Sequence, residues 1–186
     1  PMCGSGTLAI EAALTALKRA PGLLRSNFGL KHVMGFDSEA WSTLRKEVRA
    51  QSKKELPFRI IATDIDKKAV EAAKKNAQTA GVDQIIEFHV CDFTDTPIPK
   101  EKGIVIINPE YGYRLGKQHE LEETYKGIGD FFKNKCVGFT GYVFTGNIAL
   151  AKKVGLRTSR RLIFFNAKIE CRLLEYHMYV GSKREE

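Results

Sequence analysis

Four consecutive residues, Asn108-Pro109-Glu110-Tyr111, combine groups that could bind a flat base carrying an exocyclic amine. The Asn108 amide oxygen and the Pro109 carbonyl oxygen can each accept one N–H, and the Tyr111 ring can stack on the base. The stretch follows four β-branched residues (104–107), which are typical of a strand buried on both faces. Ligands of open α/β sheets bind beyond the carboxyl ends of the strands, although a plain loop after a core strand has the same sequence features.

A glycine-rich loop at residues 1–7 is the second candidate site. It reads Pro-Met-Cys-Gly-Ser-Gly-Thr and leads into a predicted helix that stops at Pro21-Gly22. Glycines let the backbone approach a ligand, and the N-terminus of a helix favours electronegative groups. A strand normally precedes such a loop, and we expect this first strand to be missing from a chain that opens inside the motif.

Carboxylates follow the next two predicted strands. Asp64 could accept both hydroxyls of a ribose, whereas Asp66 is expected to cap the following helix. Asp92 could take the amino group of an adenine, and Phe93 could pack on the adenine ring. The sequence therefore predicts a nucleoside site at the ends of successive strands.

The segment Gly4-Ser5-Gly6-Thr7-Leu8-Ala9 also matches the dinucleotide fingerprint G-x-G-x-x-A. A nicotinamide site needs an acidic residue about 20 residues further on. Asp64 lies 58 residues beyond Gly6, and Asp37 lies in a sequence that predicts a turn and a helix cap. The spacing therefore disfavours a nicotinamide cofactor.

Strands and helices alternate along the chain until a final hairpin, which predicts an α/β fold with a mostly parallel sheet. Residues 22–57 form an insertion in which Trp41, Leu44 and Val48 recur at helical spacing beside basic residues. We expect this stripe to face the core, although a basic amphipathic helix could also lie along a phosphate backbone. The strands are expected at 58–63, 85–90, 104–107, 141–145, 162–165 and 168–179, and the later helices at 67–80, 121–132 and 149–154.

The length of 186 residues fits one domain, and the net charge of +8 favours an anionic partner, by default a nucleic acid. No apolar run is long enough to span a membrane and no signal peptide is visible, so we expect a cytoplasmic protein. The cysteines form no C-x-x-C pair and the histidines show no metal-ligand spacing, which predicts reduced thiols and no metal. The four cysteines are Cys3, Cys91, Cys136 and Cys171.

The order of glycine loop, Asp64, Asp92 and Asn-Pro-Glu-Tyr resembles the class I S-adenosylmethionine-dependent methyltransferases, specifically the amino-methylating group with an N-P-P-Y motif. Further motifs resemble the THUMP-linked 23S rRNA guanine-N2 methyltransferases over essentially the whole chain. They are the glycine loop (1–7), Ile-Glu-Ala-Ala (10–13), Ala-Pro-Gly-Leu (20–23), Gly-Phe-Asp (35–37) with Trp41, Asn-Pro-Glu-Tyr-Gly-Tyr-Arg-Leu (108–115) and Phe-Asn-Ala-Lys (165–168).

This resemblance implies a Rossmann-like catalytic domain over residues 1–186, with a doubly wound, mostly parallel sheet, an antiparallel C-terminal hairpin and no first strand. It implies S-adenosylmethionine as the cofactor, 23S rRNA as the partner and an RNA-binding THUMP domain upstream. The methionine part of the cofactor would contact the glycine loop. Its ribose would contact Asp64 and Ile65, and its adenine would contact Asp92 and Phe93. The loop residues concerned are Met2, Cys3, Gly4, Ser5 and Gly6.

The resemblance also implies that Asn108 and Pro109 orient the target amine, that Tyr111 stacks on a flipped guanine, and that Asn108 contacts the cofactor as well. Glu110 stands where the family has proline, and it could accept from guanine N1–H or face solvent. The alternatives are a DNA adenine-N6 methyltransferase, a protein glutamine methyltransferase, or a non-catalytic module that binds cofactor or RNA, with Glu110 as its mark.

Overall fold

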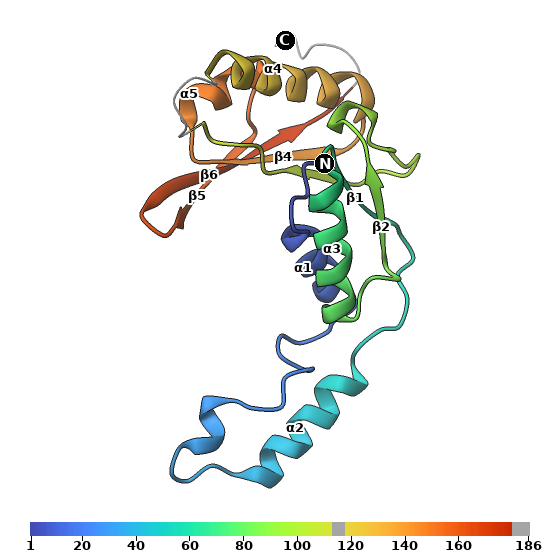
Figure 1. The fold of residues 1–186 in the computed structure, drawn as a ribbon, viewed down its shortest axis with the longest axis vertical. Helices are drawn as coiled ribbons and strands as arrows, with labels where there is room; N and C mark the ends of the chain where they lie inside the picture. The colour runs from blue at the N-terminus through green and yellow to red at the C-terminus, as the bar shows by residue number, and fades with distance from the viewer. Residues whose placement is uncertain (113–117, 180–186) are drawn as a thin grey trace. The chain divides into compact units, whose positions relative to one another are not determined.

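The structure, a computed structural model, describes residues 1–112 and 118–179. These residues divide into two compact units (Figure 1). The N-terminal unit comprises Cys3–Ala62 and Asp66–Val90, and the C-terminal unit comprises Pro1–Met2, Thr63–Ile65 and the described residues from Cys91 onward. Each unit has a hydrophobic core of its own.

The C-terminal unit is built on a four-stranded sheet in the order β3-β4-β6-β5. The strand β3 (Ile104–Ile107) runs parallel to β4 (Thr140–Thr145), with Val105 opposite Gly141. The strands β5 (Arg160–Asn166) and β6 (Ile169–His177) form the predicted antiparallel C-terminal hairpin, and β6 also pairs with β4 in antiparallel fashion.

The long helix α4 (Gln118–Lys135) lies along this sheet (Figure 1). Its apolar side chains recur every three or four residues and are buried, as expected of a helix that packs one face on a sheet. Gly129 permits a close approach, because a Cβ at this position would lie 1.9 Å from the carbonyl oxygen of Val154. The buried residues of the stripe are Leu121, Tyr125, Ile128, Phe131 and Phe132.

The C-terminal unit also contains three short helices. The 3-10 helix η2 (Phe93–Asp95) follows the strand β2, while α5 (Ile148–Ala151) and η3 (Lys152–Val154) follow β4. The last two together correspond to the helix predicted at 149–154.

The strand β1 (Ile60–Asp64), which begins in the N-terminal unit and ends in the C-terminal one, pairs with β2 (Ile86–Val90). In the N-terminal unit, the helices α1 (Thr7–Ala16) and α3 (Lys67–Ala80) contribute to the core. The prediction for α3 is confirmed at both ends. Asp66 caps the helix by accepting from the Lys68 N–H at 2.8 Å, and Gly81 ends it with φ +68°.

The insertion forms the 3-10 helix η1 (Gly29–His32) and the helix α2 (Ser38–Ala50). Asp37 caps α2 as predicted, since it accepts from the N–H groups of Glu39 and Ala40, both at 2.9 Å. The expectation of a core-facing stripe is wrong, because α2 contributes no buried residue. Trp41 instead packs edge-on within the insertion, with ring centroids 5.2 Å from Phe28 and 6.4 Å from Phe36.

Several other boundaries differ from prediction. Helix α1 ends at Ala16 rather than at Pro21-Gly22, because Lys18 takes a left-handed conformation with φ +53°. Helix α4 exceeds its predicted range by a turn at each end, and the strands pair as two separate sheets in the described chain. No helix among the described residues is long and apolar enough to cross a membrane. The predicted motif residues Tyr113, Arg114 and Leu115 lie outside the described residues.

Candidate active site

The loop after β3 brings the predicted amide and aromatic ring together. The Tyr111 hydroxyl donates a hydrogen bond to Asn108 Oδ1 at 2.8 Å. Pro109 is buried and Tyr111 half-buried, whereas Asn108 and Glu110 are exposed. Since the hydroxyl can donate only to the oxygen end of the amide, this bond fixes which way the Asn108 side chain is turned.

A buried chain of hydrogen bonds holds the backbone of this loop. The Tyr125 hydroxyl, on α4, donates to the Glu110 carbonyl at 3.2 Å and lies 2.7 Å from Thr145 Oγ1, at the end of β4. Because Tyr125 has a single hydroxyl hydrogen, the Thr145 hydroxyl donates to it and in turn accepts from the Asn147 N–H at 3.1 Å. Tyr125 and Thr145 are both fully buried. Water cannot reach their hydroxyls, so these hydrogen bonds within the protein satisfy them.

The other end of the loop is fixed as well. Asn147 Nδ2 donates to the Tyr111 carbonyl at 2.9 Å. Gly112 has φ +74°, and a Cβ there would lie 2.7 Å from Leu121 Cδ1, so only glycine fits between the loop and α4. The loop is therefore anchored through its backbone, while the Asn108 side chain remains exposed.

The sequence analysis missed Tyr125, Thr145 and Asn147 as supports of this loop. Tyr125 is part of the regular apolar stripe of α4, which reads as core alone. Thr145 and Asn147 follow the strand next to β3 and so share the ligand-binding edge of the sheet. That position was the one signal that could have identified them.

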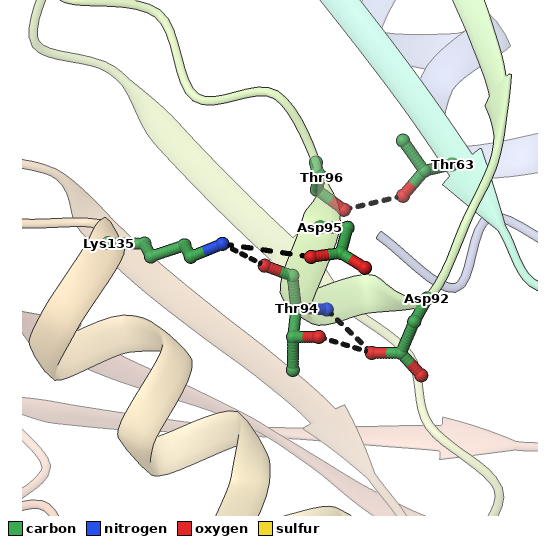
Figure 2. A network of polar contacts seen from close by, with 6 residues as sticks. All are labelled: Thr63, Asp92, Thr94, Asp95, Thr96 and Lys135. Carbon is green, nitrogen blue, oxygen red and sulfur yellow. Dashed lines mark hydrogen bonds and ion pairs between the residues drawn. The ribbon is translucent and has the colours of Figure 1, made fainter.

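A second cluster surrounds Asp92, at the turn after β2 (Figure 2). Its Oδ1 atom accepts from the Thr94 N–H at 2.9 Å and from Thr94 Oγ1 at 2.6 Å. Within the described residues no protein group donates to Oδ2. The half-buried carboxylate is thus oriented by one oxygen and can accept from a ligand with the other.

Two further contacts fix this turn (Figure 2). The hydroxyls of Thr63 and Thr96, both buried, share a hydrogen bond of 2.7 Å, which ties the end of β1 to the turn. Lys135 Nζ donates to the Thr94 carbonyl at 2.7 Å and lies 3.9 Å from Asp95 Oδ1. The turn is therefore held from both the sheet and α4.

The structure places Asp64 beside this turn, because the Asp64 carbonyl accepts from the Cys91 N–H at 3.0 Å. Asp64 is half-buried and Ile65 is 71% exposed. The Phe93 ring is partly buried against the C-terminal core, where it packs edge-on against Phe131 with centroids 6.0 Å apart. A stacking role for Phe93 is thus limited to the part of the ring that the core leaves uncovered.

The glycine loop belongs to the N-terminal unit from Cys3 onward, whereas Pro1 and Met2 belong to the C-terminal unit and Met2 packs against its core. The Gly6 N–H donates to the Cys3 carbonyl at 2.9 Å, closing a turn, and Asn76 Nδ2 donates to the Ser5 carbonyl at 2.9 Å. Gly6 has φ +85°, and a Cβ there would lie 2.9 Å from the Cβ of Ala73 on α3.

Glycine at position 6 is thus required by both conformation and packing, whereas a Cβ on Gly4 would meet nothing within 4 Å. The first turn of α1 has no side-chain cap and no acidic residue, so its N–H groups can face an electronegative ligand group. Among the described residues, no group of three or more His, Cys, Asp or Glu side chains is placed to hold a metal ion.

The chain is similar to known proteins in both sequence and fold. Residues 1–175 match the protein family described as UPF0020, RMKL-like, methyltransferase domain. The chain belongs to this family. Its structure superposes on SMU.472, a protein solved as a complex with SAH, with a TM-score of 0.89 and 25% identity, over 98% of this chain and 48% of that one. The α/β methyltransferase fold predicted from the sequence is thereby confirmed.

Curated relatives agree. Over 96% of its length the chain is 37% identical to slr0064 of Synechocystis sp., which carries the provisional name RNA methyltransferase, and it spans 47% of that protein. Over its whole length it is 38% identical to the ribosomal RNA large subunit methyltransferase K/L of Shewanella baltica, and it spans 27% of that enzyme. The chain thus spans less than half the length of these relatives.

Proposed function

We propose that the protein transfers a methyl group from S-adenosylmethionine to the N2 amine of a guanine in 23S rRNA. The observation that carries this proposal is the loop after β3, in which the Tyr111 hydroxyl donates to Asn108 Oδ1 while the Asn108 residue is exposed. Membership of a methyltransferase-domain family and similarity to a ribosomal RNA methyltransferase support both the reaction and the substrate.

The loop suits a reaction at a guanine amine. The lone pair of this amine is delocalised into the ring, so the nitrogen is a poor nucleophile. Asn108 Oδ1 retains a lone pair after accepting from Tyr111, and the Pro109 carbonyl supplies a second acceptor. Two acceptors on the N–H groups favour a pyramidal nitrogen whose lone pair faces the methyl donor, so alignment supplies most of the catalysis.

The target base must leave its helix to reach this loop. Extruding a nucleotide costs a few kcal/mol, and stacking on an aromatic ring returns about 1–3 kcal/mol. Tyr111 is half-buried and its ring lies edge-on to Phe144 with centroids 6.4 Å apart, so it can act as a platform of fixed orientation. Little general-base chemistry is needed, because the amine becomes acidic only as the methyl group arrives.

The cofactor supplies an electrophilic methyl group, and the residues present fit it. The glycine loop, from Met2 to Gly6, would hold the methionine part against its backbone and the uncapped start of α1. Asp64, with Ile65 beside it, would bind the ribose. Asp92 would accept the adenine amine with Oδ2, which lacks a protein donor among the described residues.

We further propose that this chain is the catalytic part of a longer cytoplasmic protein that also carries an RNA-binding THUMP domain. Its sheet would be the doubly wound sheet of class I methyltransferases, completed by a first strand before Pro1. The lengths of the relatives support this arrangement, since each exceeds twice the matched segment.

Incubation of the full-length protein with labelled S-adenosylmethionine and unmodified 23S rRNA tests the proposal. We expect N2-methylguanosine in the nucleoside digest, and we expect Asn108→Ala to reduce it by about 100-fold or more, since one acceptor of the reacting amine is removed. The matched control is Asn134→Ala, at an exposed position near the end of α4.

Other products would contradict the proposal in different ways. N6-methyladenine as the product would agree with the proposed cofactor but show that the methylated base is adenine. A labelled glutamine residue in a protein would show that the substrate is a protein rather than RNA. No product from a protein that still binds the cofactor would indicate a binding module, and Glu110→Pro would then restore the sequence of the N-P-P-Y group.

A further inference from the structure

We propose that the insertion between α1 and β1 carries a second RNA-binding surface, which contacts the phosphate backbone through residues other than those proposed to bind the target nucleotide. We define the arm as residues 18–55. The inference rests on the proposed function in that it takes RNA as the polymer, but it concerns residues that take no part in methyl transfer.

The arm carries an excess of positive charge. It holds nine Lys and Arg residues against four Asp and Glu residues, a net charge of +5 out of the +8 of the whole chain. About a fifth of the sequence thus supplies more than half of the net charge. Such concentration on one segment is typical of a surface that binds nucleic acid rather than of general solvation.

The basic side chains line two hollows of the N-terminal unit. The larger has a volume of about 610 Å³ and is lined by five basic residues, Arg19, Arg25, Arg49, Lys53 and Lys54, together with polar and apolar groups of the arm and α3. Among the described residues, no Asp or Glu lines it. A concave surface of this composition attracts an anion by geometry as well as by charge.

The second hollow shares Arg49 with the first. It has a volume of about 360 Å³, and Lys31, Arg45 and Lys46 line it beside Trp41. Again no acidic side chain of the described part of the chain lines it. Two adjoining basic hollows fit consecutive phosphates of a strand better than a single small anion.

Among the described residues, the positive charges of the arm are not neutralised by ion pairs. No residue of the arm forms an ion pair in the part of the chain that the structure describes. Lys46, Arg49, Lys53 and Lys54 are exposed, and their side chains donate no hydrogen bond to the described residues. Only Arg49 lies in the last turn of α2, so interaction with the helix dipole accounts for one of the four.

Other basic residues hold the hollows in shape. Arg45 donates to the carbonyls of Leu23 at 2.7 Å and Arg25 at 3.1 Å. Its guanidinium carbon also lies 5.8 Å from the centroid of the Phe28 ring and 5.7 Å from that of Trp41. These contacts fix part of the charge in advance, which reduces the entropic cost of binding a polyanion.

The test compares a quadruple variant, K46Q/R49Q/K53Q/K54Q, with wild type in the full-length protein. The matched control, K68Q/K74Q/K100Q/K102Q, also removes four positive charges from exposed lysines outside the arm. Binding of end-labelled, unmodified 23S rRNA fragments is measured by fluorescence anisotropy over a series of salt concentrations. Methyl transfer is measured in parallel with the same RNA, and circular dichroism verifies that each variant is folded.

We expect the arm variant to bind RNA at least about tenfold more weakly near 100 mM salt, and the slope of log affinity against log salt to fall by about 3, since each phosphate contact on a single strand contributes about 0.7. Its turnover at saturating RNA should equal that of wild type. The control should bind within about threefold of wild type.

Equal losses in the arm variant and the control would overturn the inference, because net charge alone would then explain the effect. Wild-type affinity and salt slope in the arm variant would also overturn it and would direct the search to an acidic protein partner. The binding assay is independent of catalysis, so a wild-type protein that binds RNA through the arm but forms no methylguanosine would contradict the proposed function and leave this inference standing.

Discussion

Tyr111 has two separable parts, a hydroxyl that orients the Asn108 amide and a ring that can stack on a base. The hydroxyl acts on the acceptor, whereas the ring acts on the nucleotide. Different substitutions remove the hydroxyl and the ring. The two roles can therefore be separated without changing the loop backbone, which other residues hold in place.

Tyr111→Phe should lower the turnover of the proposed reaction by about 3- to 10-fold, because one hydrogen bond of about 0.5–1.5 kcal/mol is lost. Tyr111→Ala should lower it by at least a further fivefold through lost stacking, worth about 1–3 kcal/mol. Single-turnover kinetics with saturating cofactor separates the two. Equal activity of the Phe and Ala variants would show that the ring does not contact the base.

Asp92→Asn should weaken the binding of S-adenosylhomocysteine by about tenfold. An asparagine oxygen can still accept from Thr94, but its NH₂ group would face the adenine amine in place of Oδ2. Isothermal titration calorimetry measures the change. Asp95→Asn, in the same turn but exposed and near Lys135, serves as the control and should bind like wild type.

For single residues, the sequence indicated which residue types lie at the strand ends. It did not indicate which other residues hold them in place. Asp66 and Asp37 are helix caps as predicted, because capping depends on neighbours within three residues. Tyr125 and Thr145 meet the loop only through tertiary packing of α4 on the sheet. Nothing in their local sequence distinguishes them from other core positions.

Among the elements, α4 and β4 together set the position of the candidate loop. The chain of donors runs from the Asn147 N–H through Thr145 and Tyr125 to the Glu110 carbonyl. Because each hydroxyl both donates and accepts, removal of one member leaves a buried partner unsatisfied.

Tyr125→Phe should therefore destabilise the protein by about 1–3 kcal/mol, the cost of a buried polar group left without its partner. Turnover should also fall, because the loop loses a contact that holds its position. The affinity for S-adenosylhomocysteine should stay within about twofold of wild type. Urea unfolding and calorimetry measure these effects. Tyr142→Phe is the control, since its hydroxyl donates to Glu175 at the hairpin instead; turnover loss in both variants would contradict a specific role for Tyr125.

The differences between predicted and observed elements share a cause. The apolar stripe of α2 was expected to face the core, and it meets aromatic residues of its own insertion instead. Periodicity shows that a helix has an apolar face, but it does not identify what covers that face. The existence of α3, β3 and the hairpin could be predicted from the sequence pattern. The division of the strands into two sheets could not, because it depends on which strands pair.

Over the whole molecule, the four cysteines lie in very different environments. Cys136 and Cys171 are fully buried, and burial raises the pKa of the Cys136 thiol to about 12, so it stays protonated at pH 8. Cys3 and Cys91 are half-buried. We expect alkylation at pH 8 to modify only the latter pair in the native protein, and all four cysteines in guanidinium.

The same labelling reports on the cofactor. S-adenosylhomocysteine should slow the alkylation of Cys3 by about tenfold, because Cys3 lies in the glycine loop proposed to hold its amino-acid part. Peptide mass spectrometry follows each cysteine separately. An unchanged rate at Cys3, with binding verified by calorimetry, would place the ligand elsewhere.

The hairpin strand β5 lies at one edge of its sheet, and six of its seven residues are exposed. Ile163 and Phe165 are 61% and 72% exposed, so this edge combines unpaired backbone groups with apolar side chains, as in strands that add to other chains during aggregation. The strand begins, however, with Arg160 and Arg161. Like charges on two approaching edges repel, so these arginines act as gatekeepers that favour solubility at high concentration.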